Sequence, residues 1–172
     1  VLQRAYPTHV AWRDAGLRYE FEYKRRGVQV LLAAFDIRTG HVVTQTVPRR
    51  TAEATVAFMD KVAQAFPAKK VYVVWDNLST HRDGPERRWT RFNQRHGGRF
   101  RFVYTPTHAS WMNQVEIWFS ILHRRVLQHG DFVSLREQRL RVEALCHRWN
   151  RVERHPFRWT WRVPESQTQL AA

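Results

Sequence analysis

The sequence is poor in cysteine, in lysine and in acidic residues, and it has no long apolar run. Cys146 is the only cysteine among 172 residues, so an internal disulfide is excluded and a reducing compartment is expected. No stretch approaches the roughly 18 consecutive apolar residues that a membrane-spanning helix needs, and no signal peptide is visible. We therefore expect neither a disulfide-stapled secreted domain nor an integral membrane protein.

The scarcity of acids leaves a strongly basic chain. Lys+Arg is 29 against 15 Asp+Glu, which gives a formal net charge of +14 at pH 7. Lysine contributes only Lys24, Lys61, Lys69 and Lys70 to this total. Arginine suits the planar, bidentate recognition of phosphate, and a basic excess of this size is typical of nucleic-acid-binding proteins. A surface tuned for solubility and a ribosome-associated protein are the alternatives.

Enough apolar residues are present for one folded domain. Hydrophobic residues make up 43% of the chain, with 8 Trp and 10 Phe. The patterns of apolar residues, caps and breakers predict the order β-β-β-α-β-α-β-α-α. The predicted strands span 19–27, 28–40, 41–47, 70–76 and 99–106, and the predicted helices span 51–67, 82–98, 109–127 and 134–152. This order predicts a single α/β domain over 1–172, in which helices flank a mixed sheet made of an antiparallel meander plus parallel strands. Right-handed crossovers would place strand 70–76 beside the first meander strand.

A carboxylate ends the predicted strand 70–76, which reads as the most buried strand. The stretch "WDNLSTH" places Asp76 and Asn77 at the carboxyl end of this strand and His81 five residues after Asp76. Open α/β sheets bind ligands at the carboxyl ends of their strands. A carboxylate beside a buried strand is costly unless it is paired, hydrogen-bonded or metal-bound. The alternative is an aspartate that only caps a helix or starts a turn.

A second acid stands alone on an apolar helix. Glu116 is the only acid of the predicted helix 109–127, and Asn113 lies three residues earlier on the same face. The alternative for this inward glutamate is a salt bridge to one of the arginines. A strand-end aspartate and an inward glutamate are hard oxygen ligands that suit Mg²⁺ or Mn²⁺. Two such ions can support cleavage of a phosphodiester.

These two stretches carry a family resemblance. "VYVVWDNLSTH" followed by "FVYTPTHASWMNQVEIWFSIL" resembles the second and third blocks of the DDE transposases, in the mariner-like superfamily and specifically its bacterial insertion-sequence branch. "AAFDIRTGHVV" and "PRRTAEATVAFMDKVAQAFP" resemble the same branch, so the resemblance covers nearly the whole chain. It implies an RNase H-like fold, with Asp76 and Glu116 as catalytic, metal-binding acids. It also implies that Asn77, His81 and Asn113 support these acids or position the substrate.

The resemblance also implies a chemistry and its partners. The family cleaves DNA at element ends with Mg²⁺ (or Mn²⁺), and the freed 3′ hydroxyl then attacks target DNA without a covalent enzyme intermediate. The implied partners are double-stranded DNA and a second copy of the chain, in the bacterial cytoplasm at the nucleoid. The first aspartate and the N-terminal helix-turn-helix of the family would lie upstream of Val1, so we expect an incomplete site and little or no cleavage. Asp36 could substitute, although in "DIRTG" it reads better as a turn-starting residue.

Arginines near the two acids are the predicted DNA-phosphate contacts. They are Arg82, Arg87, Arg88, Arg91 and Arg95 on the predicted helix 82–98, and Arg124 and Arg125 after Glu116. Each one alone could equally belong to a solvated face. The alternative functions are a non-catalytic, element-derived DNA-binding protein and another RNase H-like nuclease. No zinc site is expected, because the histidines show no paired ligand spacing with cysteine.

Overall fold

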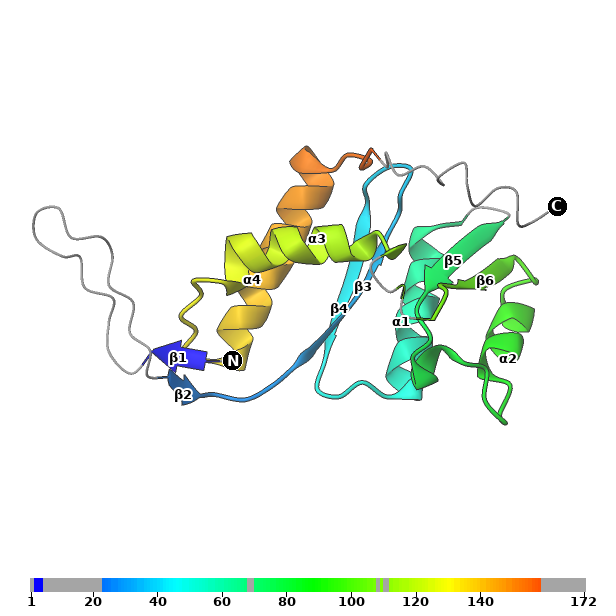
Figure 1. Ribbon diagram of the computed structural model, residues 1–172, viewed down its shortest axis with the longest axis horizontal. Helices are drawn as coiled ribbons and strands as arrows, with labels where there is room; N and C mark the ends of the chain where they lie inside the picture. Colours follow the sequence, from blue (N-terminus) through cyan, green and yellow to red (C-terminus); the bar gives the residue numbers. More distant parts are fainter. Residues whose placement is uncertain (1, 5–22, 68–69, 108, 110–111, 159–172) are drawn as a thin grey trace, which may run out of the picture.

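The part of the chain that the structure describes folds into three pairs of strands with four helices packed around them (Figure 1). The computed structural model describes residues 2–4, 23–67, 70–107, 109 and 112–158. Within these residues the strands are β1 (Leu2–Arg4), β2 (Tyr23–Arg25), β3 (Val30–Phe35), β4 (Val42–Val47), β5 (Val71–Trp75) and β6 (Phe100–Tyr104). The helices are α1 (Ala52–Ala65), α2 (Arg88–Arg95), α3 (Val115–Leu122) and α4 (Leu135–Arg148), with a 3-10 turn η1 (Ser79–His81) and π-helical extensions η3 (His123–Leu127) and η4 (Trp149–Glu153). The predicted α/β class, with antiparallel and parallel strands flanked by helices, is confirmed and is consistent with an RNase H-like fold.

The pairing of the strands differs from the prediction. In the described part of the chain, β1 pairs with β2 and β3 with β4, both antiparallel, while β5 pairs with β6 in parallel. The predicted three-stranded meander is therefore wrong for these residues, because β2 pairs with β1 and not with β3. Strand β5 likewise does not lie in the ladder of β2. Local patterns predicted the β3–β4 hairpin, whose turn is short, but they carry no information on pairing between distant strands.

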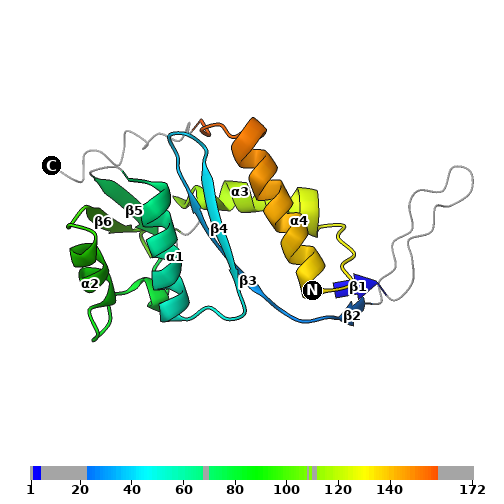
Figure 2. The same ribbon diagram turned by 180° about the vertical axis from the view of Figure 1, so that it is seen from behind.

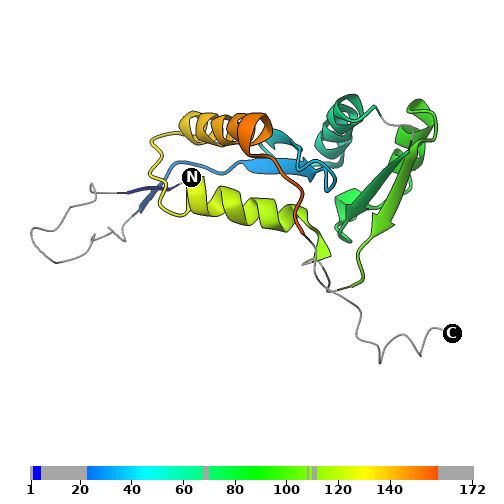
Figure 3. The same ribbon diagram turned by 90° about the horizontal axis from the view of Figure 1, so that it is seen from above.

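The β3–β4 hairpin lies between α4 and α1 in all three views (Figures 1, 2 and 3). The side chains of β3 alternate between two apolar clusters because successive residues of a strand face opposite sides. Leu32 and Ala34 pack on the first cluster, which joins α1, β5, α2 and β6. Leu31, Ala33 and Phe35 pack on the second, which joins α3, α4 and η4. The hairpin is therefore the layer that both clusters share.

Strand β5 is only half buried, in contrast to the prediction of a buried strand. Val71, Val73 and Trp75 face the first cluster, whereas Tyr72 is 66% exposed and Val74 51% exposed. Among the described residues, helices pack on only one face of the β5–β6 pair. Buried and exposed side chains therefore alternate along β5, as in a half-exposed strand.

Helices α1 and α4 begin at capping residues that lie next to them in the sequence. Thr51 accepts a hydrogen bond from the Ala54 amide at 3.1 Å and Ser134 accepts one from the Glu137 amide at 3.1 Å, so α1 and α4 begin where the sequence predicts. Helix α3 begins at Val115 rather than at 109. Ser110, which by residue type could cap the predicted helix 109–127, lies outside the described residues.

Helix α2 begins later than predicted, at Arg88 instead of 82. Gly84 (φ +70°) and Arg87 (φ +51°) adopt left-handed conformations that interrupt a helix. Asp83 then caps α2 from outside, because its Oδ1 accepts the amides of Trp89 (2.6 Å) and Thr90 (3.0 Å). None of the described helices is long and apolar enough to cross a membrane.

Candidate active site

Asp76 lies where the parallel strands β5 and β6 end together. The Thr105 amide donates to the Trp75 carbonyl at 2.9 Å, so the ladder continues to the last residue of β5. Beyond it, the side-chain amide of Asn77 donates to the Thr105 carbonyl at 2.8 Å. Asp76 is therefore held between two links that join the strand ends, at the edge where α/β sheets bind ligands.

His81 folds back onto Asp76. The η1 turn returns the chain, and Nδ1 of His81 lies 2.8 Å from Oδ1 of Asp76. Nδ1 also lies 3.1 Å from the Asp76 backbone carbonyl, and since both neighbours are acceptors, Nδ1 is the ring nitrogen that donates here. The His81 ring also stacks on the Trp75 indole, with centroids 4.7 Å apart and planes 4° apart. One ring therefore positions one oxygen of the strand-end carboxylate.

Tyr104, at the end of β6, secures the same turn. Its hydroxyl donates to the His81 carbonyl at 2.6 Å. Burial raises the pKa of the Tyr104 phenol above its usual value, so the hydroxyl remains a donor at neutral pH. Neither Tyr104 nor Trp75 was singled out by sequence analysis. The signal was the aromatic residue immediately before each strand-end break, in "VVWDN" and "FVYTP".

Asp76 is neither a helix cap nor only a turn residue. Its Oδ1 accepts the Leu78 amide at a long 3.3 Å in addition to the His81 contact. Its Oδ2 makes no hydrogen bond with the residues that the structure describes, and the side chain is 33% exposed. The carboxylate is thus oriented through one oxygen and open at the other.

Glu116 lies in the first turn of α3 and is exposed, which corrects the prediction of an inward glutamate. Trp118 and Leu122 occupy the buried face of this helix instead. The alternative of a salt bridge to an arginine is not found either within the described ranges. Asn113 lies just before the helix, and its carbonyl accepts the Glu116 amide at 3.0 Å. A glutamate in the first turn is favourable because it faces the positive end of the helix dipole.

The two acids come from elements that start at the same end of the β5–β6 pair. Asp76 follows β5, and the chain leaves β6 at Thr105 and enters α3 at Val115. Figure 1 shows the first turn of α3 at the end of the helix nearest this sheet. The structure records no direct contact between Asp76 and Glu116. Within the described residues no group of three or more His, Cys, Asp or Glu side chains could hold a metal ion.

A comparison with protein families places these residues in context. Residues 2–139 match the family described as DDE superfamily endonuclease. The chain belongs to the DDE superfamily endonucleases. The matched range includes β5, η1 and the first turn of α3, and therefore both acids. Comparisons with curated proteins and with solved structures gave no significant match.

Asp36 is a turn residue, as its sequence context indicates. Its Oδ1 accepts the Arg38 amide at 3.0 Å and its Oδ2 accepts the Thr39 hydroxyl at 2.6 Å. Both carboxylate oxygens are therefore engaged in the β3–β4 turn. This arrangement argues against Asp36 as a substitute for a third catalytic acid.

The predicted DNA-contacting arginines that follow β5 are spread over a loop and a helix, not over one helix. Arg82 follows η1, and Arg87 is the left-handed residue just before α2. Both are exposed, as is Arg91 on α2. Arg88 is half-buried and lies 3.1 Å from Glu86. Arg95, also on α2, is 3.5 Å from the Asp60 carboxylate of α1.

The two predicted arginines after α3 lie in the π-helical η3. Arg124 is exposed. Arg125 donates to the Glu153 carboxylate of η4, which also accepts from Arg148. These hydrogen bonds lower the pKa of Glu153. Arg125 is thus engaged with a carboxylate, whereas Arg124 is turned to solvent.

Proposed function

We propose that this chain is the catalytic domain of a DNA transposase, which performs metal-dependent cleavage of phosphodiester bonds and strand transfer. The observation that carries the proposal is Asp76: a carboxylate at the carboxyl ends of parallel strands, oriented through Oδ1 by His81 and open at Oδ2. The Leu78 amide alone would suffice for a turn, whereas here the stacked His81 ring contacts Oδ1 as well. Membership of the DDE superfamily endonucleases supports this function.

Asp76 and Glu116 are the residues that would hold Mg²⁺ (or Mn²⁺). Both are hard oxygen donors, and Mg²⁺ is bound by one or two carboxylates together with substrate phosphates. The donor set therefore fits the ion, although the described residues supply two acids and not three. When bound, the ion supplies Lewis-acid stabilisation of the attacking and leaving oxygens. His81 and Asn77 act by holding Asp76 and the strand ends in place, and Asn113 by accepting the Glu116 amide just before the helix.

We further propose that the exposed arginines bind double-stranded DNA. Arg82, Arg87 and Arg91 make no ion pair with a described residue and lie after the same strand end as Asp76. A net charge of +14 provides the long-range attraction to the phosphate backbone. Function as a homodimer at the bacterial nucleoid is part of the same proposal.

The experiment that tests the metal site is Mn²⁺ titration by calorimetry, on this chain and on its Asp76→Asn and Glu116→Gln variants. Both substitutions keep the shape of the side chain and remove its charge. The expected result is that each weakens Mn²⁺ binding about tenfold or more, which corresponds to about 1.4 kcal/mol for one lost ligand. Glu53→Gln is the matched control, because it removes an exposed acid on α1 and should leave binding unchanged. Mn²⁺ binding that is unchanged by both substitutions would refute a shared metal site.

A second assay tests DNA binding. Fluorescence anisotropy with a duplex should give an affinity that falls linearly with salt on logarithmic axes. Each of Arg82→Gln and Arg91→Gln should lower the slope by about 0.9, the value for one lost phosphate contact on duplex DNA. Slopes equal to that of the parent chain would exclude these two residues from the interface.

A non-catalytic DNA-binding role is the second candidate function. The described residues contain no cluster of three potential metal ligands, which favours this candidate. DNA binding with the expected salt slope, combined with no Mn²⁺ binding, would select it. Cleavage of RNA–DNA hybrids in preference to duplex DNA would instead indicate another RNase H-like nuclease.

A further inference from the structure

One edge of β4 carries backbone groups that no described residue satisfies over most of its length. In the β3–β4 register, Asp36 donates to His41 at 2.8 Å, so His41, Val43 and every second residue after them face β3. Val42, Thr44 and Thr46 therefore direct their amides and carbonyls away from β3. Thr44 and Thr46 have no backbone partner in the described part of the chain.

At Val42, the first outward-facing residue of this edge, a side chain already makes the hydrogen bonds that a neighbouring strand would make. The side chain of Asn150 accepts the Val42 amide at 2.9 Å and donates to the Val42 carbonyl at 2.7 Å. An added strand would make the same two hydrogen bonds with Thr44 and again with Thr46. The backbone of β4 at Thr44 and Thr46 therefore has the geometry to pair with an added strand.

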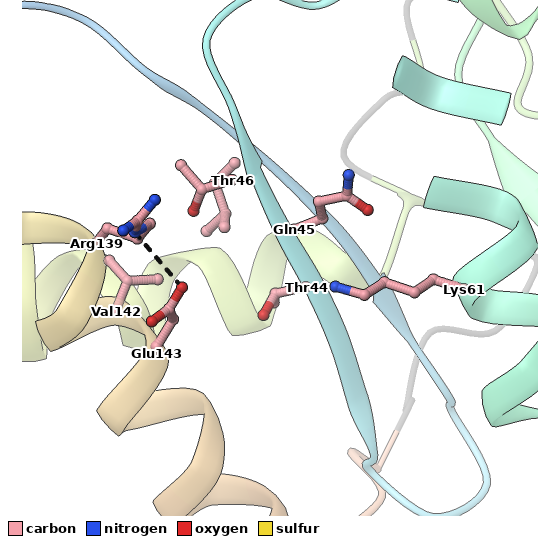
Figure 4. A pocket seen from close by; sticks show the side chains of 8 residues that line it. Thr44, Gln45, Thr46, Lys61, Arg139, Val142 and Glu143 are labelled. Atoms are coloured by element: carbon pink, nitrogen blue, oxygen red, sulfur yellow. Dashed lines mark ion pairs between the residues drawn. The ribbon is translucent and has the colours of Figure 1, made fainter. Parts of the chain in front are cut away.

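A groove runs along this edge between α1 and α4 (Figure 4). Its larger part, beside Val42 and Thr44, has a volume of about 490 Å³. Lys61 of α1 lines both parts of the groove, and Figure 4 shows its side chain extended towards β4. Arg139 and Glu143 of α4 form the opposite wall and lie 3.8 Å apart. No Pro or bulge protects β4, in contrast to many edge strands.

We propose that this groove binds an extended acidic peptide of a partner protein, which adds a strand to β4. Backbone hydrogen bonds to Thr44 and Thr46 would provide affinity, as in other strand-addition complexes. Lys61 makes no ion pair with any described residue, so it is available to an acidic side chain of the peptide. A second copy that pairs through its own β4 is disfavoured as occupant because β4 (Val42–Val47) carries no acidic residue to meet Lys61. The inference does not depend on the proposed transposase activity.

The test uses a fluorescein-labelled synthetic peptide of alternating valine and glutamate, measured by fluorescence anisotropy against the whole chain. Binding in the micromolar range is expected. Thr44→Pro should weaken it at least about tenfold, because proline removes the outward amide and leaves the bonds to β3 intact. Thr44→Val keeps that amide and should bind like the parent chain. Lys61→Glu should also weaken binding about tenfold, whereas Lys70→Glu, with the same change of net charge outside the groove, should not.

Three results would overturn the proposal. The first is equal binding of a peptide whose alternate amides are N-methylated, since charge attraction alone would then explain the affinity. The second is equal binding by the Thr44→Pro and Lys61→Glu variants. The third is a dimer of the parent chain that Thr44→Pro converts to a monomer, because a second copy would then occupy the edge. If circular dichroism shows that Thr44→Pro does not fold, the comparison of Lys61→Glu with Lys70→Glu and the N-methylated peptide still test the proposal.

Discussion

Removal of the Asn150 side chain tests how the hairpin is attached to the C-terminal helices. Asn150 of η4 forms two hydrogen bonds with the backbone of Val42, at 2.9 and 2.7 Å, across 108 residues of sequence. Asn150→Ala would leave one amide and one carbonyl of β4 without a partner. Each such group costs about 1–3 kcal/mol when it stays dry.

The groove beside Val42 and Asn150 moderates this cost. Water can enter it and replace part of the lost hydrogen bonding, so we expect the lower limit for each group and about 2 kcal/mol in total. For a chain of this length that loss lowers Tm by about 4–8 °C. Thermal and urea unfolding would measure it. Gln128→Ala, at an exposed position, is the matched control and should leave Tm unchanged.

Asn150→Asp separates the hydrogen bonds from the volume of the side chain. An aspartate can still accept the Val42 amide, but its second oxygen faces the Val42 carbonyl and repels it. A protonated carboxyl could donate there, so the folded-state pKa of this aspartate would be raised. The loss of stability should then be largest at neutral pH and should shrink as pH falls through that pKa.

Hydrogen exchange provides the refuting measurement. In the parent chain the Val42 amide should be protected, although it points away from β3, and Asn150→Ala should remove this protection. A Tm within about 1 °C of the parent, together with unchanged exchange at Val42, would show that the two Asn150 bonds do not contribute to stability. The conclusion that the Asn150 side chain takes the place of a neighbouring strand at Val42 would then be wrong.

Three further outcomes are expected. Arg99→Met should lower the free energy of unfolding by about 2 kcal/mol in urea unfolding, because the guanidinium donates to two carbonyls at the end of α1, each at 2.6 Å. Burial opposes ionisation of Asp83, but hydrogen bonds from the Thr90 side chain and from two helix amides outweigh it and lower the Asp83 pKa. The stability that the ionised Asp83 adds is fully present above its unfolded-state pKa and is lost as pH falls through its folded-state pKa. Asp83→Asn should therefore reduce stability at neutral pH and make stability depend less steeply on pH in acid. Cys146 is buried and burial raises its thiol pKa, so a thiol reagent should modify it only at the rate of unfolding.

Local features of the sequence predicted much of the fold. Thr51 and Ser134 begin helices where their caps predict, because an N-cap acts within three residues. The turn at Asp36 likewise uses only its immediate neighbours. His81 is brought to Asp76 by a single short turn, so its position five residues later was informative.

The failures of prediction all involve interactions beyond the reach of a local pattern. Asp83 caps α2 from six residues before Trp89, a spacing that ordinary capping rules do not include. The choice of β1 rather than β3 as the partner of β2 depends on long-range register. The exposure of Glu116 depends on the start of α3 at Val115, which leaves the glutamate in the first turn and the later residues Trp118 and Leu122 in the core.

Asp76 and Glu116 are positioned by different parts of the core. Asp76 is held by residues of its own neighbourhood, and Trp75 beneath it belongs to the first apolar cluster. Glu116 moves with α3, whose Trp118 is buried in the second cluster. Strand β3 contributes side chains to both clusters from its two faces. The spacing between the acids therefore depends on the β3–β4 hairpin, and a substitution there can change the proposed metal site without touching either carboxylate.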